Sequence, residues 1–107
     1  MTDLDLLTGT IASRLRLLPD VTRLYPTRTG LDALVHSVHG LLDAVADDPT
    51  VVLRPTDGAY VIETNVGLTG DVPAQQAAAA LHTAIRDTCA QHDVPVHHIR
   101  IRISSID

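Results

Sequence analysis

The stretch VVLRPTDGAYVIETNVGL, residues 51–68, decides the fold. Both of its halves are rich in Val, Ile and other strand-forming residues, and they are joined by PTDG, residues 55–58. Asp-Gly is a favoured dipeptide in the tight turn of a β-hairpin. The sequence therefore predicts a strand over residues 51–54, a turn at 55–58 and a longer return strand over 59–68.

The return strand has two different faces. Side chains two residues apart point to the same side of a strand, so Glu63 and Asn65 share one face. The other face carries mostly apolar side chains, namely those of Tyr60, Ile62, Thr64, Val66 and Leu68. This alternation is typical of a sheet with one face on the core and one face in water.

A helix and a strand are predicted after the hairpin. Asp71 can cap the helix and Pro73 suits its first turn, and the helix runs to about Gln91. Its predicted buried residues are Ala77, Ala80, Leu81, Ala84, Ile85 and Thr88. The final strand, residues 96–104, alternates between an inward and an outward set, with Ile99, Ile101 and Ile103 inward and His98, Arg100 and Arg102 outward.

Three elements are predicted before the hairpin. Residues 4–18 carry leucine and isoleucine at steps of three and four, as on one side of a helix, and Pro19 ends it. Residues 21–25 form a short strand, and residues 31–46 form a second helix. The order is helix, strand, helix, hairpin, helix, strand. We therefore predict a single α+β domain over residues 1–107, with helices packed on one face of a small sheet whose opposite face is polar.

Composition and charge exclude several classes of protein. The core must be aliphatic, because the chain has no Phe, no Trp and only two Tyr. A formal net charge of -5 argues against nucleic-acid binding, which normally needs a basic surface. The N-terminus MTDLDLL is acidic where a signal peptide is basic, and no apolar run approaches the ~20 residues of a membrane span. We expect a cytoplasmic protein without direct membrane insertion.

Three segments carry a resemblance to a known family. They are IASRLRLLPDVTRL (residues 11–24), DGAYVIETNVGLTGDVPAQQAAAALHTAI (57–85) and VPVHHIRIRI (94–103). In this order of helix, strand, glycine, proline, helix and terminal strand, the chain resembles the alkaline shock protein family of Gram-positive bacteria, also called the envelope stress response family. The resemblance implies a non-enzymatic, homo-oligomeric scaffold or adaptor that docks on a partner protein, in some members one anchored in the membrane. It implies no cofactor and no catalytic residues.

The segment DALVHSVHGLLD, residues 32–43, raises a second hypothesis. Imidazole and carboxylate groups are zinc ligands, and residues three or four apart on a helix can share one ion. The candidate ligands are Asp32, His36, His39 and Asp43, with His97 or His98 as further ligands. They would make the protein a small zinc protein or a metal-dependent enzyme. The alternative is Asp-His pairing on a solvated helix face, because four ligands spread over three turns cannot all reach one ion.

Two further motifs have plainer interpretations. Cys89 is the single cysteine and lies at the edge of its helix's apolar side, so we expect a half-buried core residue rather than a catalytic thiol. GLTG, residues 67–70, matches the GXXG loop of RNA-binding KH domains, but that loop joins two helices. Here the motif is predicted to join a strand to a helix.

The polar face of the sheet offers candidate interaction residues, which are Glu63, Asn65, His98, Arg100 and Arg102. If the two strands share a sheet, two arginines face one glutamate on an otherwise acidic protein. This pattern fits cross-strand ion pairs on a solvated face, and it equally fits a docking surface, because arginine is enriched at protein interfaces.

Overall fold

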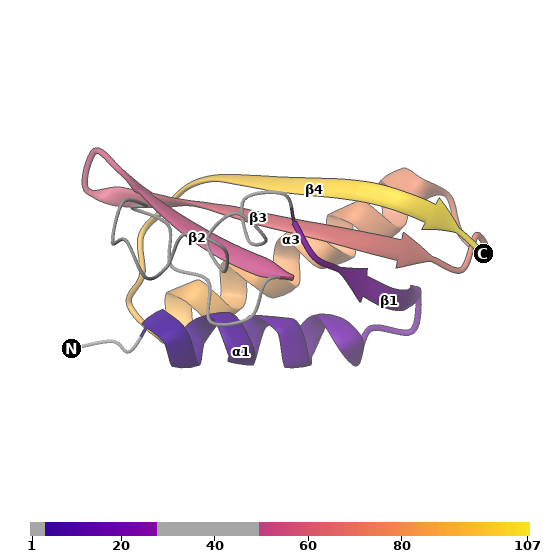
Figure 1. Ribbon diagram of the computed structural model, residues 1–107, viewed down its shortest axis with the longest axis horizontal. Coiled ribbons are helices and arrows are strands. Elements are labelled where there is room, and N and C mark those ends of the chain that lie inside the picture. Colours follow the sequence, from indigo (N-terminus) through magenta and orange to yellow (C-terminus); the bar gives the residue numbers. More distant parts are fainter. Residues whose placement is uncertain (1–3, 28–49) are drawn as a thin grey trace.

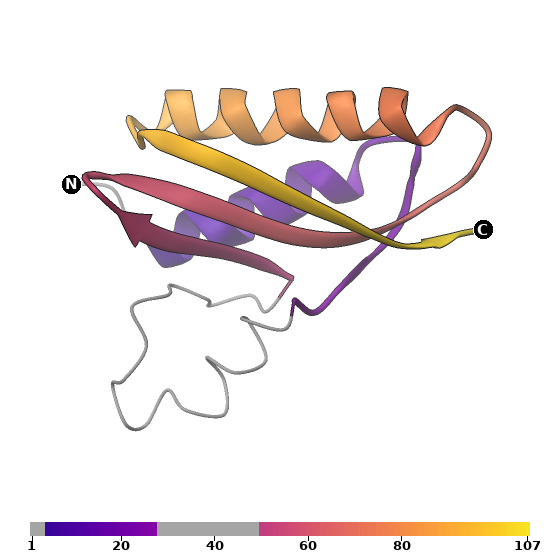
Figure 2. The same ribbon diagram turned by 90° about the horizontal axis from the view of Figure 1, so that it is seen from above.

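The computed structural model describes residues 4–27 and 50–107. In chain order these residues form α1 (Leu4–Arg16), β1 (Val21–Tyr25), β2 (Val51–Thr56), β3 (Ala59–Leu68), α3 (Ala74–Gln91) and β4 (Val96–Ile106). Both helices lie on one face of the four-stranded sheet (Figures 1 and 2). The predicted α+β class and the one-sided helical layer are confirmed. The helix predicted over residues 31–46 lies outside the described residues.

β3 is the central strand of the sheet. β1 and β2 share one of its edges, where both run antiparallel to it: β2 pairs with its first half and β1 with its last residues. On the other edge β4 runs parallel to β3 from Tyr60↔Val96 to Leu68↔Ile106. A parallel pair needs a long crossover, which α3 supplies between β3 and β4.

The core lies between the sheet and the two helices, and it is aliphatic as predicted. It takes every second residue of the strands and one side of each helix, in the alternation that the sequence shows. The largest fully buried side chains of this core are Leu7, Ile11, Leu15, Val51, Leu53, Ile62, Val66, Leu81 and Ile85.

The buried side of α3 differs from the prediction. Ala77, Leu81, Ile85 and Thr88 are buried as expected, but Ala84 is only partly buried, Ala80 is exposed, and Cys89 is fully buried instead of half-buried. At 100° per residue these changes rotate the buried arc by about 50° toward Cys89. α3 packs against both α1 and β4, so two neighbours share its buried side.

Several predicted boundaries also change. β2 continues through Pro55 and Thr56, so only Asp57 and Gly58 form the turn, both with positive φ. β4 continues to Ile106. Asp71 does not cap α3: Pro73 occupies the N-cap position, without a side-chain hydrogen bond. The Asp71 amide instead donates to Thr69 Oγ1 in the strand-to-helix turn.

Gly67 lies where β1, β3 and β4 run side by side. A Cβ placed on it would lie 2.6 Å from Ser105 Oγ and 2.8 Å from Thr22 Oγ1, both closer than real Cβ contacts. Two side-chain hydrogen bonds link β1 to the C-terminal end of the chain across this glycine. Tyr25 and Ser105 share one of 2.9 Å, and Thr22 donates the other to Asp107 at 2.6 Å. The glycine therefore allows the close approach of three strands.

Candidate functional site

The face of the sheet opposite the helices, here called the polar face, collects the candidate interaction residues. β3 and β4 pair Glu63 with Arg100 and Asn65 with Arg102, and His98 lies beside Val61. The predicted shared face therefore exists, because the two strands are neighbours in register. That these residues bind a partner stays a prediction.

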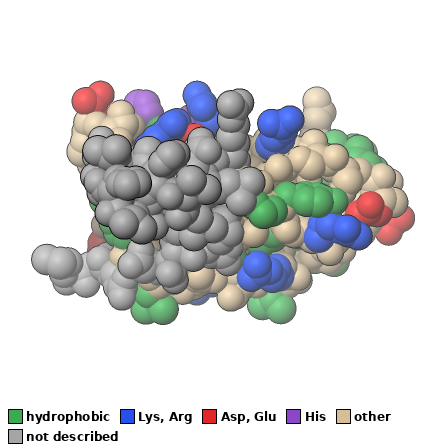
Figure 3. Space-filling view, viewed as in Figure 1, with side chains coloured by type: hydrophobic (Ala, Val, Ile, Leu, Met, Phe, Trp, Pro, Cys, Tyr) green, Lys and Arg blue, Asp and Glu red, His purple; other side chains and the backbone are tan. Residues whose placement is uncertain are grey.

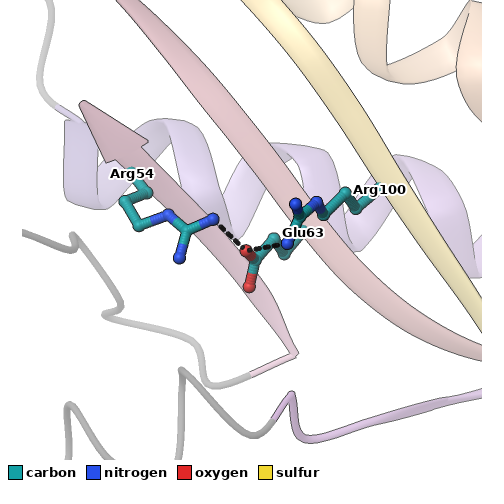
Figure 4. Close-up of polar contacts among 3 residues, drawn as sticks. All are labelled: Arg54, Glu63 and Arg100. Atoms are coloured by element: carbon teal, nitrogen blue, oxygen red, sulfur yellow. Dashed lines mark ion pairs between the residues drawn. The ribbon is translucent and has the colours of Figure 1, made fainter. Parts of the chain in front are cut away.

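Glu63 is the centre of an ion-pair cluster built from three strands. Its Oε1 lies 2.8 Å from Arg54 Nη2 on β2 and 3.8 Å from Arg100 Nη1 on β4 (Figure 4). The Glu63 side chain is only 13% exposed, whereas those of Arg54 and Arg100 are 40% and 63% exposed. One carboxylate is thus shared by two arginines whose side chains still reach water.

Arg54 was missed as a member of this site, although the sequence holds the signal for it. The hairpin register pairs Val52 with Glu63 and Arg54 with Val61, which places Arg54 diagonally from Glu63 on the same face. Diagonal cross-strand neighbours lie within reach of long side chains. Counting back from the Asp57-Gly58 turn predicts this arrangement.

Among the described residues, arginines outnumber carboxylates on the polar face. Arg23 of β1 also lies on it, paired with Gly67, and its guanidinium stands 5.9 Å from the centre of the Tyr25 ring. Arg102 is exposed, and no carboxylate among the described residues forms an ion pair with it. Among the described residues, these four arginines share the face with Glu63 and, at its Gly67 end, with the Asp107 carboxylate that accepts a hydrogen bond from Thr22. Basic side chains gather along the upper part of Figure 3, where β4 lies.

A hollow of about 320 Å³ lies among these arginines. Arg54, Arg100 and Arg102 line it together with Glu63, and Asn65 contributes an amide whose Oδ1 accepts a hydrogen bond from Ser104. Guanidinium groups with free donors around a concavity suit a carboxylate or another anionic group. The site can therefore receive negative charge from outside.

Cys89 has the properties of a core residue. It is completely buried among the apolar side chains, and burial raises the pKa of its thiol to about 11. The nucleophilic form of cysteine is the thiolate, and a raised pKa suppresses it near neutral pH. The prediction of a core cysteine is confirmed, with deeper burial than expected.

The metal candidates Asp32, His36, His39 and Asp43 lie outside the described residues, so zinc binding there stays a prediction. Within residues 4–27 and 50–107 no group of three or more His, Cys, Asp or Glu side chains is placed to hold a metal ion. His97 and His98 are exposed at the start of β4. GLTG joins β3 to α3, as predicted, with Gly70 at a positive φ.

Comparison with known proteins gives a fold relative but no family. No protein-family model matches the sequence, and no curated protein matches it. One solved structure is similar: a variant of the MamM CTD in which a histidine, a glutamate and a cysteine are replaced. The TM-score is 0.53 at 10% sequence identity, over 97% of this chain and 96% of that domain. At this identity the likeness concerns the fold alone. Among the described residues, no helix has the length and apolar character to span a membrane.

Proposed function

We propose that this protein is a non-enzymatic scaffold or adaptor, which self-associates and docks an acidic surface of a partner protein on its polar face. The observation that carries the proposal is the surplus of arginine around Glu63 on a chain whose net charge is -5. Such concentrated opposite charge steers and orients a partner. A cytoplasmic role in an envelope stress response, beside a membrane-anchored partner, is the finer form of this proposal and rests on the sequence resemblance.

The docking half is tested with a peptide of about eight glutamates, added to the ¹⁵N-labelled protein while amide resonances are followed. We expect shifts confined to the polar face, strongest near Arg54, Arg100 and Arg102, and weaker at higher salt because exposed charges are screened. Arg102→Glu should weaken them about tenfold in apparent affinity. Arg16→Glu makes the same change of charge at the end of α1, on the helical side, and should leave them. Shifts elsewhere, or none, would contradict docking on this face.

Self-association is proposed for the outer side of α1. Leu6 is 63% exposed and Leu17, just past the helix, is 83% exposed. Eleven residues apart, they lie only about 20° apart around the helix axis. Between them Gly9 has open space above it and Ser13 is exposed, so a second helix can approach closely. Figure 3 shows hydrophobic side chains protruding along the lower edge of the molecule, where α1 lies.

Light scattering over a concentration range tests this part. The wild-type mass should rise with concentration, and Leu6→Ser with Leu17→Ser should keep the protein monomeric. Ile106→Ser removes an equally exposed apolar side chain at the end of β4 and should change nothing. A mass that is independent of both leucines would rule out α1 as the contact.

A further inference from the structure

Within the part of the chain that the structure describes, β4 is a long strand with one unpaired edge. It pairs with β3 along one side over nearly all of its length, and none of the strands formed by residues 4–27 and 50–107 pairs with its other side. Its outer edge therefore presents backbone N–H and C=O groups that can receive one more strand. Figure 1 shows β4 along the border of the sheet.

The inner side of this edge is a groove between β4 and α3. It has a volume of about 520 Å³. Ile99 and Ile101 line one side, and Gln75, Ala78, Ala79, His82 and Thr83 line the other. Small alanines on α3, opposite two isoleucines, leave room for apolar side chains. An added strand would direct every second side chain into this groove.

The outer side of the same edge is basic. His98, Arg100 and Arg102 are exposed on the polar face, at every second position of β4. On this side an added strand would place its alternate side chains directly opposite them. Acidic residues would be stabilised there and basic ones would be repelled.

These charges decide between a partner and a second copy of the chain. Two copies of β4 related by a two-fold axis would run antiparallel and place their outward residues opposite one another. In the register centred on Arg100, the contacts of residues 98, 100 and 102 would then join arginine or histidine to arginine or histidine, and like charges directly opposite destabilise a strand pair. The basic side chains of this edge therefore disfavour pairing with a second copy of β4 and favour pairing with an acidic strand.

We propose that the free edge of β4 binds an extended segment of a partner protein in which acidic and apolar residues alternate. The acidic side chains pair with Arg100 and Arg102, and the apolar side chains enter the groove against Ile99, Ile101 and the alanines of α3. Backbone hydrogen bonds to β4 add the segment to the sheet as a fifth strand. The inference rests on the proposed docking function and specifies its partner.

The test uses a capped peptide of about nine residues in which Glu and Val alternate, long enough for an ordinary strand. Three comparison peptides separate the contributions. One carries N-methyl groups on alternate amides and cannot form the ladder, one has the same composition with Glu and Val in separate blocks, and one is the oligo-glutamate used above. Affinity is measured by isothermal titration calorimetry, and the site by amide shifts.

We expect the alternating peptide to bind about tenfold or more tightly than the other three, with shifts along β4 and at Ala78 and Ala79. Arg102→Glu should weaken this binding about tenfold, and Arg16→Glu should not. Equal binding of the N-methylated peptide would overturn the added strand while leaving docking on the polar face intact. If none of the acidic peptides bound, both the added strand and docking on the polar face would be overturned. A change of oligomeric state in Arg102→Glu would assign the edge to a second copy and would also overturn the inference.

Discussion

The two faces of the sheet are built from alternate residues of the same strands, yet they are constructed differently. On the inner face Ile62 and Val66 are completely buried in the core. On the outer face, one position away, Glu63 and Asn65 lie among arginines that reach water. The inner face is complementary to the rest of the chain, whereas the charge of the outer face is not balanced within the described residues. Charge that the fold does not use is available to a partner.

The largest expected effect lies on the inner face. Leu81 is completely buried between α3, α1 and the sheet, so Leu81→Ala removes apolar contacts and leaves a cavity. We expect the free energy of unfolding to fall by about 2–5 kcal/mol, measured by urea denaturation. Leu17→Ala truncates an exposed leucine and is the matched control. Equally small losses of stability in both variants would mean that Leu81 is no more tightly packed than the exposed Leu17.

The next effect tests whether the outer face is rigid where β1 joins it. In Gly67→Ala the new methyl group meets Ser105 and Thr22, so one strand must shift. We expect a loss of stability of about 1–3 kcal/mol, as for overpacking elsewhere. Gly9→Ala is the control, because its added Cβ meets nothing within 4 Å. A Gly67→Ala variant as stable as the wild type would mean that the three strands approach each other less closely.

The stability of the protein as a function of pH tests the burial of Cys89 in the core. Burial raises the pKa of the Cys89 thiol to about 11, so the folded state keeps the proton at pH values where the unfolded chain releases it. The stability that this residue contributes is therefore complete below about pH 9 and falls as the pH rises toward about 11. Wild-type stability should decrease over this interval more steeply than that of Cys89→Ala. Parallel curves for the two proteins would contradict a buried thiol.

The smallest expected effect on stability belongs to Arg102. Its side chain is exposed and has no ion-pair partner among the described carboxylates, so Arg102→Ala should change the free energy of unfolding by no more than about 0.5 kcal/mol. Urea denaturation measures this change, with Leu81→Ala measured alongside for comparison. A loss of stability as large as that of Leu81→Ala would show that the polar face stabilises the fold as much as the inner face does.

Local patterns in the sequence predict much of this fold. Alternation identifies both faces of β3 and β4, and the Asp57-Gly58 dipeptide places the hairpin. These local patterns do not predict features that depend on contacts between residues far apart in the chain. The parallel pairing of β4 with β3 is non-local, so Glu63 and Arg100 could be placed together only conditionally. The buried side of α3, which includes Cys89 and leaves Ala80 exposed, faces both α1 and β4, and these neighbours cannot be read from the helix's own periodicity. Of the site, Arg54 could have been found by counting register across the turn.

The most direct test of the central claim is the affinity of an acidic peptide for the wild type and for Arg102→Glu, measured under identical low-salt conditions. We expect the oligo-glutamate peptide to bind the wild type and to lose about tenfold or more of its affinity in the variant, while both proteins unfold at closely similar urea concentrations. Equal affinities in two equally stable proteins would contradict this, because the peptide would then bind without using Arg102 of the polar face.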